Sequence, residues 1–299
     1  MNISTLARNP RAIKALTGLS YQEFTDLVPT FEKILIEIRR EDKKRVRAFG
    51  GGRKGALPTP EAKLFFILFY LKTYPTFDVL GFFFNKPRGR SCEHAHFLMR
   101  VLKRSLGREL VLPKRRISSV EEFLEAFPEV KDVFGDGTER RIQRPKKPRR
   151  EHKAYSGKKK AHTRKNLILS DEKKRILIVS PTKSGRRHDK RVMDKMILAE
   201  RIPPNVGFFG DSAFQGIQHI HPNACIPKRG TKKHPLTEEE RAQNHVISSF
   251  RMVIEHAISG IKRFRALVDV LRNKIGRFDD DCIEICAGLW NYHLRYATA

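Results

Sequence analysis

Two short stretches, VFGDGT at 133–138 and FFGDSA at 208–213, have almost the same pattern. Each has two apolar residues, a glycine, an aspartate and then small residues. The sequence around them shows no further similarity, so an internal repeat does not explain the match. An aspartate beside a glycine is often only a turn residue. If both stretches are neighbouring strands of one sheet, however, they deliver Asp136 and Asp211 to the same point.

The chain after Pro128 has the pattern of an α/β domain. Short runs rich in Val, Ile, Leu and Phe, bounded by Gly, Pro, Asp and Ser, predict strands. The expected strands lie within 129–138, 163–171, 175–182, 205–213 and 224–229, with helices at 189–202 and from Thr237 into the 260s. The order of strands and helices predicts a sheet flanked by helices.

The chain before that point is expected to be helical. Apolar residues recur at helical spacing within 20–40, and the run at 64–71 is apolar nearly all round, which is typical of a central helix. The expected N-cap residues are Ser20, Thr59, Thr76, Ser91 and Ser119, and Gly107 is expected to end the fourth helix. We therefore predict an all-α domain over 1–125 and an α/β domain over 126–299.

Helix, short turn and basic helix within 59–107 form the outline of a helix-turn-helix DNA reader. An ordinary helical hairpin with solvated cations has the same outline, and the pattern alone does not separate the two. The cations expected to contact DNA here are Arg88, Arg90, Arg100, Lys103 and Arg104.

The charge balance points to a polyanionic partner. The 299 residues carry a formal net charge of +28, and 13 of the 26 residues from 140 to 165 are Lys or Arg, against one acid. Such an excess favours nucleic acid. A membrane is not expected, because the longest apolar run is too short to span a bilayer. The candidate contacts are Arg140, Arg144, Tyr155, Lys158, Lys159, Lys160 and His162.

Two carboxylates brought close together repel each other unless a cation lies between them. Their hard oxygen ligands suit Mg²⁺ or Mn²⁺. A third carboxylate, Glu255, lies on the long C-terminal helix, on one polar strip with Arg251 and Lys262. The alternative for that strip is a solvated Arg–Glu pair.

Three weaker candidates, Glu139, His188 and Asp189, lie near the strand ends. For Asp189, N-capping of a helix is the alternative. The four cysteines are scattered, which predicts core thiols. No nucleotide cofactor is expected, because the glycine-rich stretch at 50–55 lacks the spacing of a phosphate-binding loop.

Together these residues resemble the DDE-type transposases of bacterial insertion sequences, in the branch related to Harbinger-like elements. The motifs that carry the resemblance are DGTERRIQRP at 136–145, YSGKKKAHTRK at 155–165, SGRRHDK at 184–190, GDSAFQG at 210–216 and R-x3-E-x6-K at 251–262. The helical segment at 59–106 resembles the helix-turn-helix that precedes such catalytic domains. Many relatives have a tyrosine three residues before the arginine, where this chain has Ser248, which puts that DNA contact in doubt.

The resemblance implies a ribonuclease-H-like fold in the α/β domain, with Asp136, Asp211 and Glu255 as the acidic triad. It implies two Mg²⁺ or Mn²⁺ ions, cleavage of transposon-end DNA and strand transfer to target DNA, with Arg251 and Lys262 holding phosphates. A homodimer or larger assembly on double-stranded DNA, in the cytoplasm or nucleoid of a bacterial host, is the matching expectation. Two alternatives stay open: a transposase-derived DNA-binding protein that no longer cuts, and a metal-dependent nuclease on the same fold.

Overall fold

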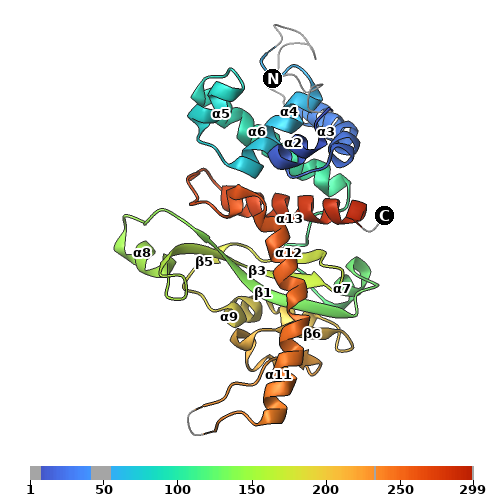
Figure 1. Ribbon diagram of the computed structural model, residues 1–299, viewed down its shortest axis with the longest axis vertical. Helices are drawn as coiled ribbons and strands as arrows, with labels where there is room; N and C mark the ends of the chain where they lie inside the picture. The colour runs from blue at the N-terminus through green and yellow to red at the C-terminus, as the bar shows by residue number, and fades with distance from the viewer. Residues whose placement is uncertain (1–7, 42–54, 232–233, 298–299) are drawn as a thin grey trace. The chain divides into compact units, whose positions relative to one another are not determined.

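The computed structural model describes residues 8–41, 55–231 and 234–297, which form two compact units (Figure 1). The helical unit contains the described residues of Met1–Leu112, Lys262–Asp269 and Asp281–Ala299, and the sheet unit contains those of Pro113–Ile261 and Val270–Asp280. Each unit therefore draws on distant parts of the sequence. The domain boundary near residue 125 stays a prediction. Residues 50–54 of the glycine-rich stretch lie outside the described residues.

The helical unit is built around one apolar helix. Its elements are α2 (Pro10–Thr17), α3 (Tyr21–Glu41), α4 (Pro60–Thr73), α5 (Phe77–Phe83), α6 (Arg88–Arg108), η3 (Arg265–Leu267) and most of α13 (Phe278–Ala297). Every residue of α4 from Leu64 to Leu71 is buried, which confirms its expected central place. The sequence patterns did not predict α2 or α13.

The helix starts agree with the expected caps except at α6. Ser20 accepts a hydrogen bond from the backbone N–H of Glu23 at 3.2 Å, and the Glu23 carboxylate accepts one from the N–H of Ser20 at 2.9 Å. This is the reciprocal capping box. The prediction that Ser91 caps the fourth helix is wrong: α6 begins at Arg88, because Pro87 already has φ −59° and leads directly into the first turn. Gly107 lies inside the last turn of α6.

The sheet unit contains a mixed sheet, as expected, but it has seven strands. Its strands are β1 (Asp132–Arg141), β2 (Tyr155–Ser156), β3 (Ala161–Asp171), β4 (Ile176–Val179), β5 (Lys183–Ser184), β6 (Gly207–Gly210) and β7 (Ala224–Cys225). They follow the order β2-β3-β1-β6-β7, and β4 and β5 also pair with β3. Strands β2 and β5 were not predicted. Strand β1 lies between β3, to which it is antiparallel, and β6, to which it is parallel, so the sheet is mixed.

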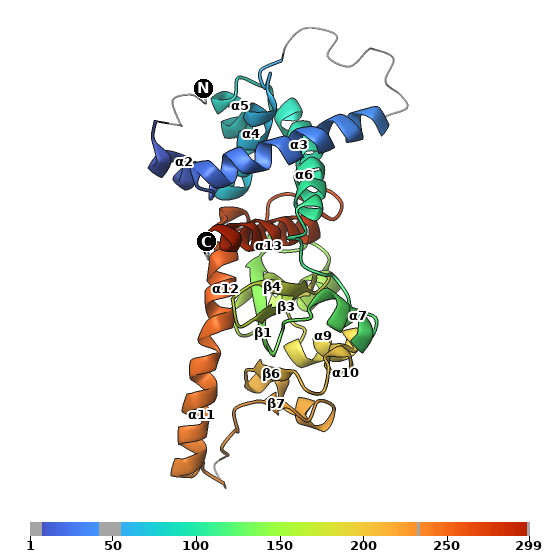
Figure 2. The same ribbon diagram turned by 90° about the vertical axis from the view of Figure 1, so that its right-hand side faces the viewer.

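Helices pack on both faces of this sheet. Their bounds are α7 (Val120–Ala126), α8 (Pro148–Ala154), α9 (Asp189–Met196), α10 (Leu198–Arg201), α11 (Glu238–Phe250) and α12 (Met252–Lys262). Successive strand residues point to opposite faces. Val133 and Phe208 join the core with α7, α9 and α10. Their neighbours Phe134 and Phe209 stack on the other face, where Phe209 contacts Phe250 of α11, with 5.4 Å between ring centroids. Figure 2 shows α11 and α12 following each other along that side of the strands.

The expected long C-terminal helix begins where predicted but is interrupted. Thr237 and Glu240 form a complete capping box at the start of α11. The helix breaks at Arg251, which separates α11 from α12. Among the described residues, none of the helices is both long and apolar enough to cross a bilayer.

Candidate active site

The parallel pairing of β1 with β6 places Asp136 and Asp211, the aspartates of the two similar stretches, side by side. Gly135 of β1 pairs with Gly210 of β6. Asp136 and Asp211 are the residues that follow these two glycines. Both glycines face the core, where a β-carbon at either position would crowd the ring of Phe208. The aspartates then point to the opposite face, the one that Phe250 of α11 contacts through Phe209. Asp211 directly follows β6, as expected. The expectation of a strand end at Asp136 is wrong, because β1 continues to Arg141 against β3.

The Asp136 carboxylate is in a strongly perturbed setting. Burial raises its pKa, and the neighbouring carboxylates of Asp211 and Asp189 raise it further. The backbone N–H of Gly137, which donates to Asp136 Oδ1 at 2.7 Å, and the guanidinium of Arg251 act in the other direction. A cation between these oxygens would remove the repulsion between the carboxylates. The donor set is therefore chemically suited to a hard divalent ion.

Asp189 lies on the other face of β1, against Gly137. It is the first residue of α9, and His188, not Asp189, is at the N-cap position, where it makes no side-chain capping bond. The expected N-cap alternative for Asp189 is therefore wrong. A β-carbon at residue 137 would overlap its carboxylate. Burial raises the pKa of Asp189, whereas the Lys165 ammonium, 3.1 Å from Asp189 Oδ1, lowers it.

Sequence reasoning missed Lys165 as a site residue. Its ammonium lies 3.4 Å from Glu139 Oε1 as well as beside Asp189, and all three side chains are at most 9% exposed. Thr163 completes the group by donating a 2.6 Å hydrogen bond to Glu139. Glu139 and Lys165 are direct cross-strand partners in the β1–β3 register. The available sequence signal was the presence of an acid, Glu139, and a lysine, Lys165, in two strands that can pair with each other.

Glu255 does not stand with the two aspartates. Its carboxylate is 52% exposed and pairs with Arg251 at 3.7 Å, which is the i,i+4 pair that the sequence left open as the alternative. Lys262 is the last residue of α12. Within the described ranges, no group of three His, Cys, Asp or Glu side chains is close enough to hold a metal ion. Two ligands of the expected triad are adjacent, and the assembly of the third stays a prediction.

The basic segment is divided between exposed and buried cations. Lys158, Lys159 and Lys160 are exposed in the turn between β2 and β3, beside the half-exposed ring of Tyr155, which contacts His162 edge-on. Arg144 pairs with Glu151 at 2.7 Å. Arg140, in contrast, is 2% exposed and donates to the Asp279 carbonyl at 2.8 Å. Its position is that of a structural residue, not of a surface contact.

Four of the five candidate cations of the helical unit have acidic partners among the described residues of that unit. Arg88 lies 3.7 Å from Asp78, Arg90 lies 2.8 Å from Glu93, Lys103 lies 2.7 Å from Asp281, and Arg104 makes two 2.8 Å bonds to Glu41. Arg100 is exposed. The pairs of Arg88, Arg90 and Arg104 are exposed and contribute little stability, whereas Lys103 is part-buried between Asp281 and Glu284.

The sheet unit is thus an α/β domain with two adjacent carboxylates beside a strand end and a strongly basic segment. The chain belongs to the DDE superfamily endonucleases, whose family model matches residues 135–291. It is also similar to the "Probable transposase for insertion sequence element IS702" of Microchaete diplosiphon, with 26% identity over 284 residues, covering 95% of each chain. No solved structure matches the chain.

Proposed function

We propose that the protein is a DNA transposase, which cuts DNA at the ends of its own mobile element and joins those ends to target DNA. The observation that carries this proposal is the β1–β6 register, which sets Asp136 beside Asp211. Membership of the DDE superfamily endonucleases supports DNA cutting. Similarity over 95% of the chain to a protein described as a probable transposase supports a transposase over another nuclease.

The catalytic residues in this proposal are Asp136, Asp211 and Glu255, holding two Mg²⁺ or Mn²⁺ ions. Such ions, when bound, activate a water or a DNA 3′-hydroxyl and stabilise the departing oxygen. Glu255 joins the two aspartates after leaving its exposed pair with Arg251, which costs little to break. Arg251, released from that pair, and Lys262 then hold phosphates of the strand that is cut.

The buried group of Glu139, Lys165 and Asp189 supports the central strand from its other face. Because Lys165 neutralises two buried carboxylates, it fixes the position of β1 directly beneath Asp136. This role needs no contact with DNA.

In our proposal, α5 and α6 form the helix-turn-helix that reads the element ends. The two helices are joined by the four residues Phe84, Asn85, Lys86 and Pro87. Gly81 lets the turn approach α5 closely, since a β-carbon there would overlap the Lys86 carbonyl oxygen. A short turn packed on a glycine is typical of this motif. Two such proteins, at least, act together, because two ends must be joined.

The test uses two labelled duplexes of equal length, one with the terminal repeat of the element and one of random sequence. A transposase cuts only the first, joins it to a target plasmid, and does so only with Mg²⁺ or Mn²⁺. A general nuclease cuts both duplexes and joins neither. A DNA-binding protein without catalytic function retards the repeat in a gel and leaves it intact with either metal.

A further inference from the structure

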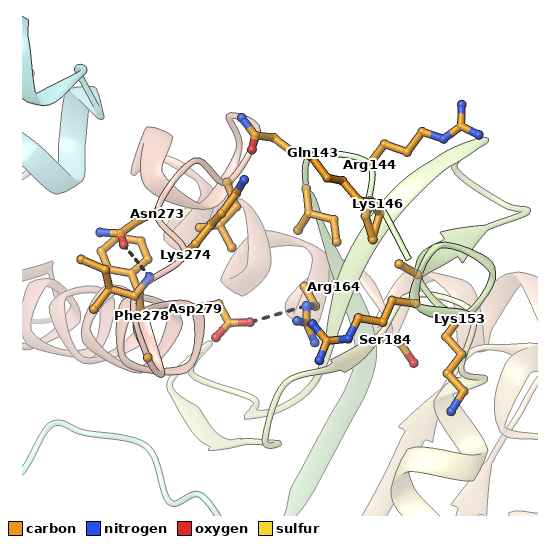
Figure 3. A pocket seen from close by; sticks show the side chains of 17 residues that line it. Gln143, Arg144, Lys146, Lys153, Arg164, Ser184, Asn273, Lys274, Phe278 and Asp279 are labelled. Carbon is orange, nitrogen blue, oxygen red and sulfur yellow. Dashed lines mark hydrogen bonds and ion pairs between the residues drawn. The ribbon is translucent and has the colours of Figure 1, made fainter. Parts of the chain in front are cut away.

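A basic cavity of about 790 Å³ lies in the sheet unit, and none of the three proposed catalytic acids lines it (Figure 3). Its walls are the residues that follow β1 (142–146), helix α8, Arg164 of β3, Ser184 of β5 and the segment 271–279. Six lining residues are cationic: Arg144, Lys146, Arg150, Lys153, Arg164 and Lys274. Among the described lining residues, Asp279 is the single acid.

Among the residues that the structure describes, two of these cations have an acidic partner. Arg144 pairs with Glu151 at 2.7 Å, and Arg164 lies 3.9 Å from Asp279, the pair that Figure 3 marks across the cavity. The other four have no ion pair with an acid of the described chain. Like charges gathered around a concave surface concentrate positive potential and repel one another. An anionic ligand would relieve that repulsion.

Part of the remaining wall is apolar, which a site for bare phosphate does not need. Ile142, Pro145, Leu271, Ile275 and Phe278 line the cavity. Ile275 is 56% exposed, next to Gly276, whose positive φ of 50° turns the chain there. In pockets that hold an extruded base, aromatic and apolar side chains pack against its flat faces. Cations together with apolar walls, in a volume typical of small-ligand sites, match a nucleotide.

We propose that this cavity holds one unpaired nucleotide of a DNA strand. Its phosphates contact Lys146, Arg150, Lys153 and Lys274, and its base lies against the apolar wall beside Ile275. A base within a duplex is covered by its neighbours, so only an unpaired nucleotide offers base and phosphate to one cavity. This inference rests on the proposed function for its choice of DNA as the ligand, and it adds a site separate from the catalytic acids.

The test measures fluorescence anisotropy of the full chain with a labelled 12-nucleotide single strand and a labelled hairpin duplex. Lys153→Ala/Lys274→Ala is expected to lower affinity for the single strand roughly tenfold and for the duplex less than about twofold. Ile275→Ser, which changes no charge, should lower single-strand affinity at least about threefold. The matched control, Lys131→Ala/Lys195→Ala, removes two exposed lysines of the sheet unit outside the cavity.

An equal loss in the control, or an equal loss for the duplex, would overturn the proposal. So would competition by free thymidine monophosphate as strong as that by the oligonucleotide, because the site would then be one for a free nucleotide. If a variant does not fold, the test instead measures acetylation of lysines in the wild-type protein. In that experiment the single strand should protect Lys153 and Lys274 but not Lys131 and Lys195, and absence of this difference contradicts the site.

The two proposals fail separately. Asp136→Asn should bind the single strand as the wild type does. If the wild-type protein binds the single strand but does not cleave the element ends, this result contradicts only the proposed transposase function. Normal cleavage without the single-strand preference contradicts only the nucleotide site.

Discussion

The carboxylate of Asp189 lies against the backbone of Gly137, in the space that a side chain at position 137 would occupy. A methyl group there must push Asp189 away from Lys165, its 3.1 Å partner. We therefore expect Gly137→Ala to lower the free energy of unfolding by about 1–3 kcal/mol, measured by urea denaturation. The same variant should cut DNA more slowly, because Asp136 is the adjacent residue.

Gly157→Ala is the matched control for this substitution. Gly157 lies in the turn between β2 and β3, and a β-carbon there meets nothing within 4 Å. Its unfolding midpoint should stay at the wild-type value. If Gly137→Ala also unfolds at the wild-type midpoint, this result would contradict the close approach of Asp189 to Gly137.

The proposed triad predicts the effect of three isosteric changes. Asp136→Asn, Asp211→Asn and Glu255→Gln should each slow strand cleavage roughly thousandfold, with DNA binding almost unchanged in a gel-shift assay. Mg²⁺ should raise the melting temperature of the wild type, because it binds only the folded site, but not that of Asp136→Asn. The control is Asp194→Asn, which removes an exposed carboxylate of α9 paired with Lys190. Cleavage at the wild-type rate by any one of the three would remove that residue from the triad.

The adjacency of Asp136 and Asp211 could be predicted from the sequence because it depends on a local pattern that occurs twice. Two apolar residues and a glycine before each aspartate give both strands the same alternation, and parallel pairing then aligns them. The capping box at Ser20 is local in the same way, since it needs only the side chain three residues on. Such features follow from short-range chemistry.

Features that depend on distant partners could not be predicted. Arg140 stands in a run of cations that looks uniformly solvated, yet its guanidinium is buried against the Asp279 carbonyl, 139 residues away. Lys165 is buried because Glu139 and Asp189 meet it from two other elements. The short helix α8 did have a local signal, Pro148 at its first position, but the surrounding charge concealed it.

The buried pairing of Lys165 predicts a large loss of stability in Lys165→Met. Removing the ammonium leaves the Glu139 and Asp189 carboxylates buried without a counter-ion, which should cost about 3–5 kcal/mol in urea denaturation. Adding Glu139→Gln and Asp189→Asn should restore much of that loss, since no buried charge then remains. Lys173→Met, at an exposed pair with Glu129, should change stability by less than about 0.5 kcal/mol. A small effect of Lys165→Met would show that the two acids are not charged.

His94 in α6 predicts a pH dependence of stability. Burial, followed by the nearby Lys86 ammonium, lowers the pKa of His94 to about 4, and its Nδ1 has no hydrogen-bond partner among the described residues. The unfolded chain takes up a proton near pH 6.5, whereas the folded chain does so only near pH 4. Stability therefore falls as the pH drops through this window, by about 1–2 kcal/mol. His94→Gln should weaken this dependence, and His245→Gln, at an exposed position of α11, should not. Equal pH profiles for wild type and His94→Gln would contradict the lowered pKa of His94.

The turn between β2 and β3 predicts a specific salt dependence of DNA binding. Lys158 and Lys159 are exposed in this turn, within the cation-rich segment 140–165, so we expect a bound strand to contact it. Lys158→Ala/Lys159→Ala should reduce the slope of log affinity against log salt by about 1.8 for duplex DNA, because two phosphate contacts are lost. Lys160, with a positive φ of 46°, is left unchanged to avoid altering the turn. Lys131→Ala/Lys195→Ala removes the same charge elsewhere and should leave the slope within about 0.5 of the wild type. If both double variants reduce the slope equally, the turn acts only through net charge and holds no phosphate.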